Sequence, residues 1–190
     1  SVVPQITTVA KLAVEKILKK EVLVVGAGIK TGLNIRIDNP AQLGSDLVVD
    51  SVAALAEYPV PLLVFDMGTA NTVCVIDRHK NYIGGMIYPG IGVSLDSLTE
   101  NASQLGGISL EAPEHIIGKN TVDCMKSGAI YSSAAAIDGI IDRLSEELEG
   151  EVTVIATGGL AKKIVPHCRR KIILDDNLLL KGLAVIYRKN

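Results

Sequence analysis

The stretch LLVFDMGTANTVCVID, residues 62–77, decides the fold. It opens with an apolar run of four residues, continues through a turn-like segment from Asp66 to Asn71, and ends in a second strand pattern from Thr72 to Asp77. Asn81 to Tyr88, which contains two consecutive glycines, predicts a third strand. We therefore expect an antiparallel meander of three strands, with a carboxylate near the end of the first.

Helical and strand patterns alternate after the meander. We expect a helix that begins near Ser94 or Leu95 and an amphipathic helix marked by apolar residues between 137 and 148. Residues 152–156 predict a buried strand, and residues 171–174 predict a short strand. A last helix is expected to end at Tyr187. This order predicts a complete α/β lobe.

The region before the meander is shorter in structural elements. It predicts a helix around residues 9–17, a buried strand at Val22–Gly26, a loop to Pro40 and a second helix from Asp46. Tyr58-Pro59-Val60-Pro61 ends that helix and is the best boundary in the chain. We expect residues 1–59 to be the rear part of one lobe and residues 60–190 to be a second, complete lobe.

The composition fits such a chain. Of the 190 residues 48% are hydrophobic and 3% aromatic, so aliphatic side chains must build the core. The net charge is −2 and no long basic run is present, which argues against a nucleic-acid partner. No apolar stretch approaches the roughly 18 residues that span a membrane. Three widely separated cysteines indicate reduced thiols and a cytoplasmic location.

The turn after the first strand of the meander has residues suited to a phosphate. Gly68 permits close backbone approach, Thr69 and Thr72 offer hydroxyl donors, and Asp66 can hold a cation. An ordinary β-hairpin would use similar residues, so both interpretations stay open.

Two other glycine-containing segments invite a nucleotide interpretation. Gly158-Gly159 follows a strand and precedes a helix, where backbone can pack under a flat ligand or form a plain turn. Residues 26–32, GAGIKTG, tempt a dinucleotide-binding interpretation, but Thr31 occupies the third glycine position and no helix pattern follows. Only tight NAD binding would favour the hypothesis of a Rossmann-type enzyme.

Asp46 stands at the start of the second predicted helix, after Gly44 and Ser45. An Asp there most often caps the helix. The helix dipole also favours its charged form, so it could accept a proton from an alcohol that attacks ATP.

Taken together, these segments resemble the type III pantothenate kinases. The matching pieces appear in the family's order over the whole chain: residues 1–4 (SVVP), 28–32 (GIKTG), 38–40 (DNP), 44–46 (GSD), 66–70 (DMGTA), 84–91 (GGMIYPGI), 117–121 (IGKNT), 127–128 (SG) and 156–160 (ATGGL). The ordered set is specific.

The resemblance implies the RNase H-like, actin-like ATPase fold, with mixed sheets covered by helices. It implies ATP-dependent phosphorylation of pantothenate to 4'-phosphopantothenate, the first step of coenzyme A biosynthesis. Mg²⁺ with ATP and a monovalent cation, K⁺ or NH₄⁺, are the implied cofactors, and a homodimer is the implied assembly.

The resemblance also implies residue roles. Asp46 would be the general base, Gly44 and Asp46 would contact pantothenate, and Thr121 would reach pantothenate from the neighbouring subunit. Asp66 would bind a cation. The implied ATP-binding residues are Gly68, Thr69, Thr72, Gly158 and Gly159.

Several positions depart from the family pattern. Leu47 stands where many members have an Arg suited to the pantothenate carboxylate, so another residue must supply that charge or the substrate differs. Asn71, Cys74 and Lys126 replace a common Thr, Asp and Gln. The family's opening strand with its Asp-x-Gly-Asn-Thr motif is absent, so we expect that segment to be missing or supplied by another chain, with an open sheet edge if uncovered.

These departures leave one alternative within the same fold. The chain could be a catalytically inactive paralogue that binds nucleotide or regulates transcription. ATP binding without turnover would favour that alternative.

Overall fold

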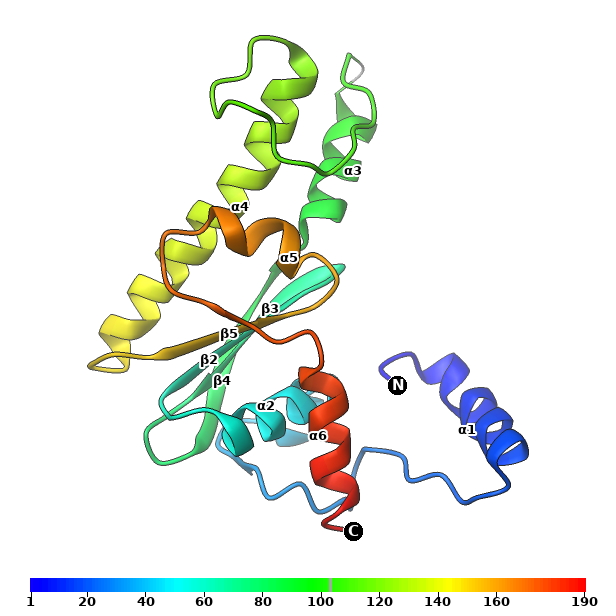
Figure 1. Cartoon of the computed structure of the whole chain (residues 1–190). Coiled ribbons are helices and arrows are strands. Elements are labelled where there is room, and N and C mark those ends of the chain that lie inside the picture. The colour runs from blue at the N-terminus through cyan, green and yellow to red at the C-terminus, as the bar shows by residue number, and fades with distance from the viewer. Residues whose placement is uncertain (103) are drawn as a thin grey trace.

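The computed structural model describes residues 1–102 and 104–190, which form one mixed sheet covered by helices (Figure 1). The strands are β1 (Asn34–Ile35), β2 (Leu62–Met67), β3 (Ala70–Ile76), β4 (Asn81–Pro89), β5 (Thr153–Thr157) and β6 (Ile173–Leu174). The helices are α1 (Pro4–Leu18), α2 (Ser45–Glu57), α3 (Ile91–Asn101), α4 (Thr121–Glu147), α5 (Ala161–Ile164) and α6 (Leu178–Tyr187). Short 3₁₀ helices occupy Pro40–Gln42 and Val165–His167.

The predicted meander is confirmed. The strand order is β1-β4-β3-β2-β5-β6, with β2 antiparallel to β3 and β3 antiparallel to β4. The outer strands add in parallel: β1 pairs with β4, β5 with β2, and β6 with β5. The first strand extends through Asp66 to Met67, so Asp66 lies within β2 and the turn tightens to Gly68 and Thr69.

Alternate residues of the central strands bury against opposite helical layers, because successive strand side chains point to opposite faces. Leu63, Phe65 and Met67 of β2 join a core with α4 and α5. Leu62 and Val64 join a second core with α2 and α6. Figure 1 shows these two helix pairs on opposite sides of the sheet. Both cores are mainly aliphatic, as the composition predicts.

Helices α2 and α6 cross at close range. A Cβ atom placed on Gly182 of α6 would meet the carbonyl oxygen of Val49 and would lie 2.7 Å from Val49 Cγ1. Glycine therefore allows the two backbones to approach, and this contact holds the start of α2 against the sheet.

Helix α1 projects from the body of the molecule and is joined to it by an extended segment (Figure 1). The prediction of this helix is confirmed. The prediction of a strand at Val22–Gly26 is wrong, because these residues have no regular secondary structure. Leu23 and Val24 are 41% and 37% exposed, and the segment passes beside α1 without pairing to the sheet. An apolar run becomes a strand only when a neighbouring strand accepts its backbone hydrogen bonds, which local sequence does not specify.

The other predicted helices differ from the observed ones mainly in the residue at which each helix begins. Helix α3 begins at Ile91, slightly before the predicted start. Helix α4 begins at Thr121, well before Ile137, and the Asn120 side chain accepts the Asp123 N–H there at 2.9 Å. None of the helices among the described residues is long and apolar enough to cross a membrane.

The division into residues 1–59 and 60–190 stays a prediction. β1, from the first part, pairs with β4 of the second, and α2 packs on α6. The two parts therefore share a sheet and a helical layer.

Candidate functional site

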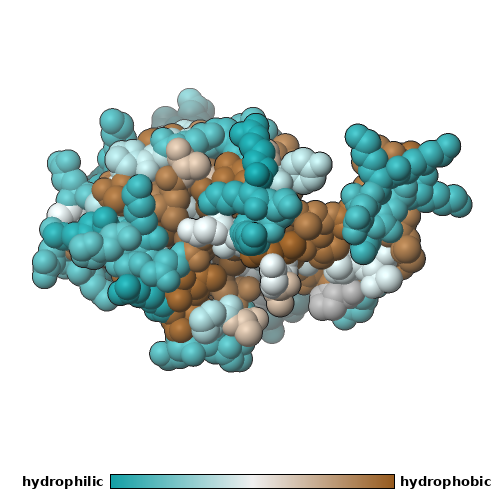
Figure 2. Space-filling model, turned by 90° about the horizontal axis from the view of Figure 1, so that it is seen from below, coloured by the Kyte–Doolittle hydropathy of each residue, from teal (hydrophilic) through white to brown (hydrophobic). Residues whose placement is uncertain are grey.

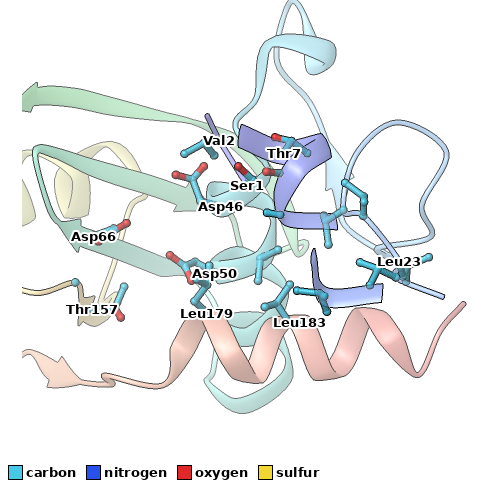
Figure 3. A pocket seen from close by; sticks show the side chains of 18 of the residues that line it. Ser1, Val2, Thr7, Leu23, Asp46, Asp50, Asp66, Thr157, Leu179 and Leu183 are labelled. Carbon is cyan, nitrogen blue, oxygen red and sulfur yellow. The ribbon is translucent and has the colours of Figure 1, made fainter. Parts of the chain in front are cut away.

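A pocket of about 820 Å³ lies between α1, the segment 22–25, α2, α6 and the ends of β2 and β5. The carboxylates of Asp46, Asp50 and Asp66 lie toward one end of it, and Leu23 and Leu183 lie toward the other (Figure 3). Viewed from below, apolar side chains also reach the surface between the body and the part that projects at the right (Figure 2). The pocket thus has a charged end against the sheet and an apolar end against α1 and α6.

Helix α2 brings Asp46 into the pocket from its first turn. The Leu47 N–H donates to Asp46 Oδ1 at 2.9 Å, which leaves Oδ2 available to another group. A Cβ on Gly44, the residue at the N-cap, would lie 2.5 Å from Asp46 Oδ1. Gly44 therefore leaves room for this carboxylate to fold back over the helix start. Gly44 itself does not line the pocket.

Asp66 lies in the middle of a polar row across three strands. It pairs with Thr72 of β3 on one side and with Thr157 of β5 on the other. Directly paired residues project on the same face of a sheet, so all three side chains face α2. Burial, and then the nearby charge of Asp46, raise the pKa of the Asp66 carboxyl. Thr72 Oγ1 is buried and has no hydrogen-bond partner among the described residues.

Gly158 lies directly against Asp66. It has a φ of +93°, a conformation that side chains other than glycine rarely adopt. A Cβ there would clash with Asp66 Oδ1 and lie 2.6 Å from both the backbone N and O of Met67. Gly158 and Gly159 both line the pocket. The glycine pair thus lets the turn after β5 pack against the carboxylate at the end of β2.

Asp50 is a site residue that sequence reasoning missed. It is 2% exposed, lines the pocket, and its Oδ1 has no partner among the described residues. Burial, followed by the charges of Asp66, Asp46 and Asp175, raises its pKa to about 7. Its one signal in the sequence is its position four residues after Asp46, which places both carboxylates on the same side of a helix.

Other predicted site residues lie outside this pocket. Gly68 and Thr69 form the β2–β3 turn, where Gly68 N–H donates to Ala70 O at 3.2 Å and Thr69 O accepts the Gly90 N–H at 3.0 Å. Thr121, at the start of α4, lines a separate pocket of about 470 Å³ between α3 and α4. The structure therefore brings Asp46, Asp66 and the glycine pair together, and leaves Thr121 apart from them.

Positive charge at the pocket comes from two lysines rather than from position 47. Leu47 packs against the core beneath α2 and does not line the pocket. Lys11 lines it from α1, with its Nζ 3.7 Å from Glu15 Oε1. Lys162 lines it from α5, with its Nζ 2.5 Å from Asp176 Oδ2.

The residues of the pocket suit a magnesium ion that arrives with phosphates. Among residues 1–102 and 104–190, no three His, Cys, Asp or Glu side chains are close enough to form a protein-only metal site. Mg²⁺ is commonly held by one or two carboxylates plus substrate phosphates. Asp46, Asp50 and Asp66 offer such oxygens, and Asp50 Oδ1 has no hydrogen-bond partner within residues 1–102 and 104–190.

Comparisons with known proteins show the family of this chain. A family model described as type III pantothenate kinase matches residues 1–143. A type III pantothenate kinase of Bacillus cytotoxicus is 45% identical over 190 residues, covering 100% of this chain and 72% of that protein.

Two solved structures resemble the fold. A conserved Baf family protein of Campylobacter jejuni aligns with a TM-score of 0.53 and 23% identity, over 84% of this chain and 70% of the other. The ethanolamine utilization protein EutJ of Carboxydothermus hydrogenoformans aligns with a TM-score of 0.51 and 16% identity, over 96% and 72%. These likenesses show the fold alone, and they confirm the predicted actin-like architecture.

Proposed function

This chain belongs to the type III pantothenate kinase family, and we propose that the pocket between α1, α2 and α6 is where it phosphorylates pantothenate. The chain is a kinase of coenzyme A biosynthesis that transfers a phosphoryl group from ATP to pantothenate. The family match over residues 1–143 and the 45% identity to a curated kinase support this activity. No observation favours the alternative of an inactive regulatory paralogue.

One observation carries the location of the site. Asp46, Asp66 and the Gly158-Gly159 turn come from three separate elements and line the same pocket. Phosphoryl transfer depends on positioning and on electrostatic stabilisation of the phosphates, so a base, a cation ligand and a close backbone must meet at one place. The residues proposed for these three roles line this pocket.

Asp46 is our proposed general base. Its Oδ1 accepts the Leu47 N–H, which fixes the carboxylate at the start of α2. Its free Oδ2 can accept the proton of the pantothenate hydroxyl as that oxygen attacks the γ-phosphorus of ATP. Gly44 supports this role by leaving room for the carboxylate. Contacts of Gly44 and Asp46 with pantothenate belong to the same proposal.

The nucleotide and its cations belong at the sheet end of the pocket in this proposal. Mg²⁺, when bound, would offset phosphate charge. Asp66 would hold a cation, and Thr72, beside it in the polar row, would offer its hydroxyl, which has no partner in the described part of the chain. Gly68 and Thr69 would approach phosphates from the β2–β3 turn, and Gly158 and Gly159 would lie beside adenosine. A requirement for K⁺ or NH₄⁺ is part of the proposal.

The assembly and location are also proposals. Thr121 lines a different pocket from Asp46, so a contact between Thr121 and pantothenate would have to come from a second subunit. This supports a homodimer. The three cysteines are free, which supports a reducing, cytoplasmic compartment.

Substitution of the proposed base tests the site. We expect Asp46→Asn to lower kcat for ADP release by about a hundredfold or more while ATP binding stays within about twofold, because the amide cannot take the proton. Asp96→Asn, on the exposed face of α3, is the matched control and should keep wild-type kinetics. Full activity of Asp46→Asn would rule out Asp46 as the base.

A further inference from the structure

The pocket is lined by more acidic than basic side chains. Four carboxylates line it, from Asp46, Asp50, Asp66 and Asp176, against the two lysines Lys11 and Lys162. Both substrates of the kinase are anionic. A pocket with this excess of negative charge needs each available cation to face the bound phosphates or carboxylate.

Lys162 is the cation beside the glycine pair. It follows Gly158-Gly159 by a few residues and lines the pocket with them. In the structure its Nζ is 2.5 Å from Asp176 Oδ2. The two side chains are 68% and 45% exposed. Ion pairs this exposed contribute little to stability, so a stronger anion can displace one partner at little cost.

The neighbouring charged residues are engaged differently. The Asp175 carboxylate accepts the Tyr58 hydroxyl at 2.8 Å and pairs with Lys181 at 2.7 Å. Lys163 Nζ donates to the Leu110 carbonyl at 3.1 Å and does not line the pocket. Asp175 and Lys163 therefore contact other parts of the fold. Their chain neighbours, Asp176 and Lys162, line the pocket.

We propose that Lys162 is a nucleotide-phosphate ligand that exchanges its Asp176 partner for a phosphate of ATP. The inference rests on the proposed function, since it takes ATP as the occupant. Asp176 would hold the ammonium group at the pocket in the absence of nucleotide. On binding, Lys162 would supply a positive charge beside the carboxylates of Asp46 and Asp66, where phosphate charge is otherwise opposed.

Binding measurements with ATP, ADP and adenosine test this proposal. For Lys162→Gln we expect the Kd for ATP and ADP to rise about tenfold, with adenosine binding unchanged, because only the phosphates lose a charged contact. For Asp176→Asn we expect ATP to bind the same or up to about fivefold tighter, because the competing carboxylate is gone. Lys163→Gln is the matched control and should bind all three ligands as the wild type does.

The outcomes separate a phosphate ligand from a structural ion pair. Equal weakening of ATP by both Lys162→Gln and Asp176→Asn, equal loss for adenosine and ATP, or an unchanged Kd for ATP in Lys162→Gln would each overturn the proposal. If the wild type binds ATP but releases no ADP with pantothenate, the proposed function fails, while the difference between ATP and adenosine still decides the role of Lys162. A wild type that does not bind ATP would overturn both.

Discussion

At the scale of single residues, the site combines acidic groups with burial that opposes their charge. Burial affects the pKa of Asp50 strongly, because this side chain is almost fully buried on α2 and faces the charges of Asp66, Asp46 and Asp175. Its pKa is raised to about 7 from a usual value of 3.8. Such a residue costs stability in its charged form.

Replacement of Asp50 by Asn should change how stability depends on pH. Between about pH 4 and pH 7 the folded wild type holds a proton that the unfolded chain releases, so wild-type stability falls as pH rises through this window. The neutral Asn lacks this dependence. The free energy of unfolding of Asp50→Asn minus that of wild type should therefore be larger at pH 8 than at pH 5. The increase should be on the order of 2–4 kcal/mol.

Urea unfolding at the two pH values, without nucleotide or divalent cations, measures this difference. Asp96→Asn, at an exposed position on α3, controls for a general effect of charge removal. The same stability difference between Asp50→Asn and wild type at both pH values would contradict a raised pKa for Asp50.

At the scale of elements, the site depends on how closely α2 approaches α6. Gly182 makes that approach possible, because any Cβ would meet the Val49 backbone. The crossing sets the position of the first turn of α2, and with it the position of Asp46. A change at Gly182 therefore acts on both stability and the site.

Gly182→Ala should lower the free energy of unfolding by roughly 1–3 kcal/mol, because the added methyl overpacks the crossing. Gly128→Ala is the matched control: it lies in helix α4, and a Cβ there meets nothing within 4 Å. The control should raise stability by up to about 1 kcal/mol through better helix propensity. Chemical denaturation checks both, and equal gains in stability would contradict the close crossing.

Local patterns predicted most elements because the signals are local. The β2–β3–β4 meander and helices α2 and α6 follow from apolar runs and periodicity. The failed strand at Val22–Gly26 has the same local signal but no neighbouring strand to pair with. Whether a partner exists depends on the tertiary structure, so periodicity alone could not separate the two cases.

The site was predictable to a similar degree. Asp46, Asp66 and the Gly158-Gly159 pair stand at element ends, and the family resemblance marks them. Asp50 and Lys162 were missed because their importance arises from burial and from neighbours distant in sequence. The charge of Asp66 in β2 acts on Asp50, and Lys162 of α5 pairs with Asp176, which follows β6. No sequence motif around either residue predicts these contacts.

At the scale of the whole molecule, two of the proposed substrate contacts are separated. Asp46 lines the pocket beside α1, and Thr121 lines the one between α3 and α4. A single subunit does not bring them into one cavity. The proposed homodimer would join Asp46 of one subunit to Thr121 of the other.

Mixing two inactive variants tests this arrangement. If Asp46→Asn and Thr121→Ala each lose most activity, mixed dimers should recover one intact site in two. Random exchange of subunits gives roughly half mixed dimers, so about a quarter of the wild-type rate is expected. Asp46→Asn mixed with Asp66→Asn is the control and should recover much less, because Asp46 and Asp66 line the same pocket of one subunit, and Asp66→Asn removes the proposed cation ligand. Recovery in neither mixture would contradict a site shared between subunits.

ADP release by this chain with ATP, Mg²⁺ and K⁺, measured with and without pantothenate, tests the proposed kinase activity. We expect ADP formation that depends on pantothenate, saturates with it, and is matched by an equal amount of 4'-phosphopantothenate detected by mass spectrometry. ADP formation that ignores pantothenate, or ATP binding with no turnover at any pantothenate concentration, would contradict it.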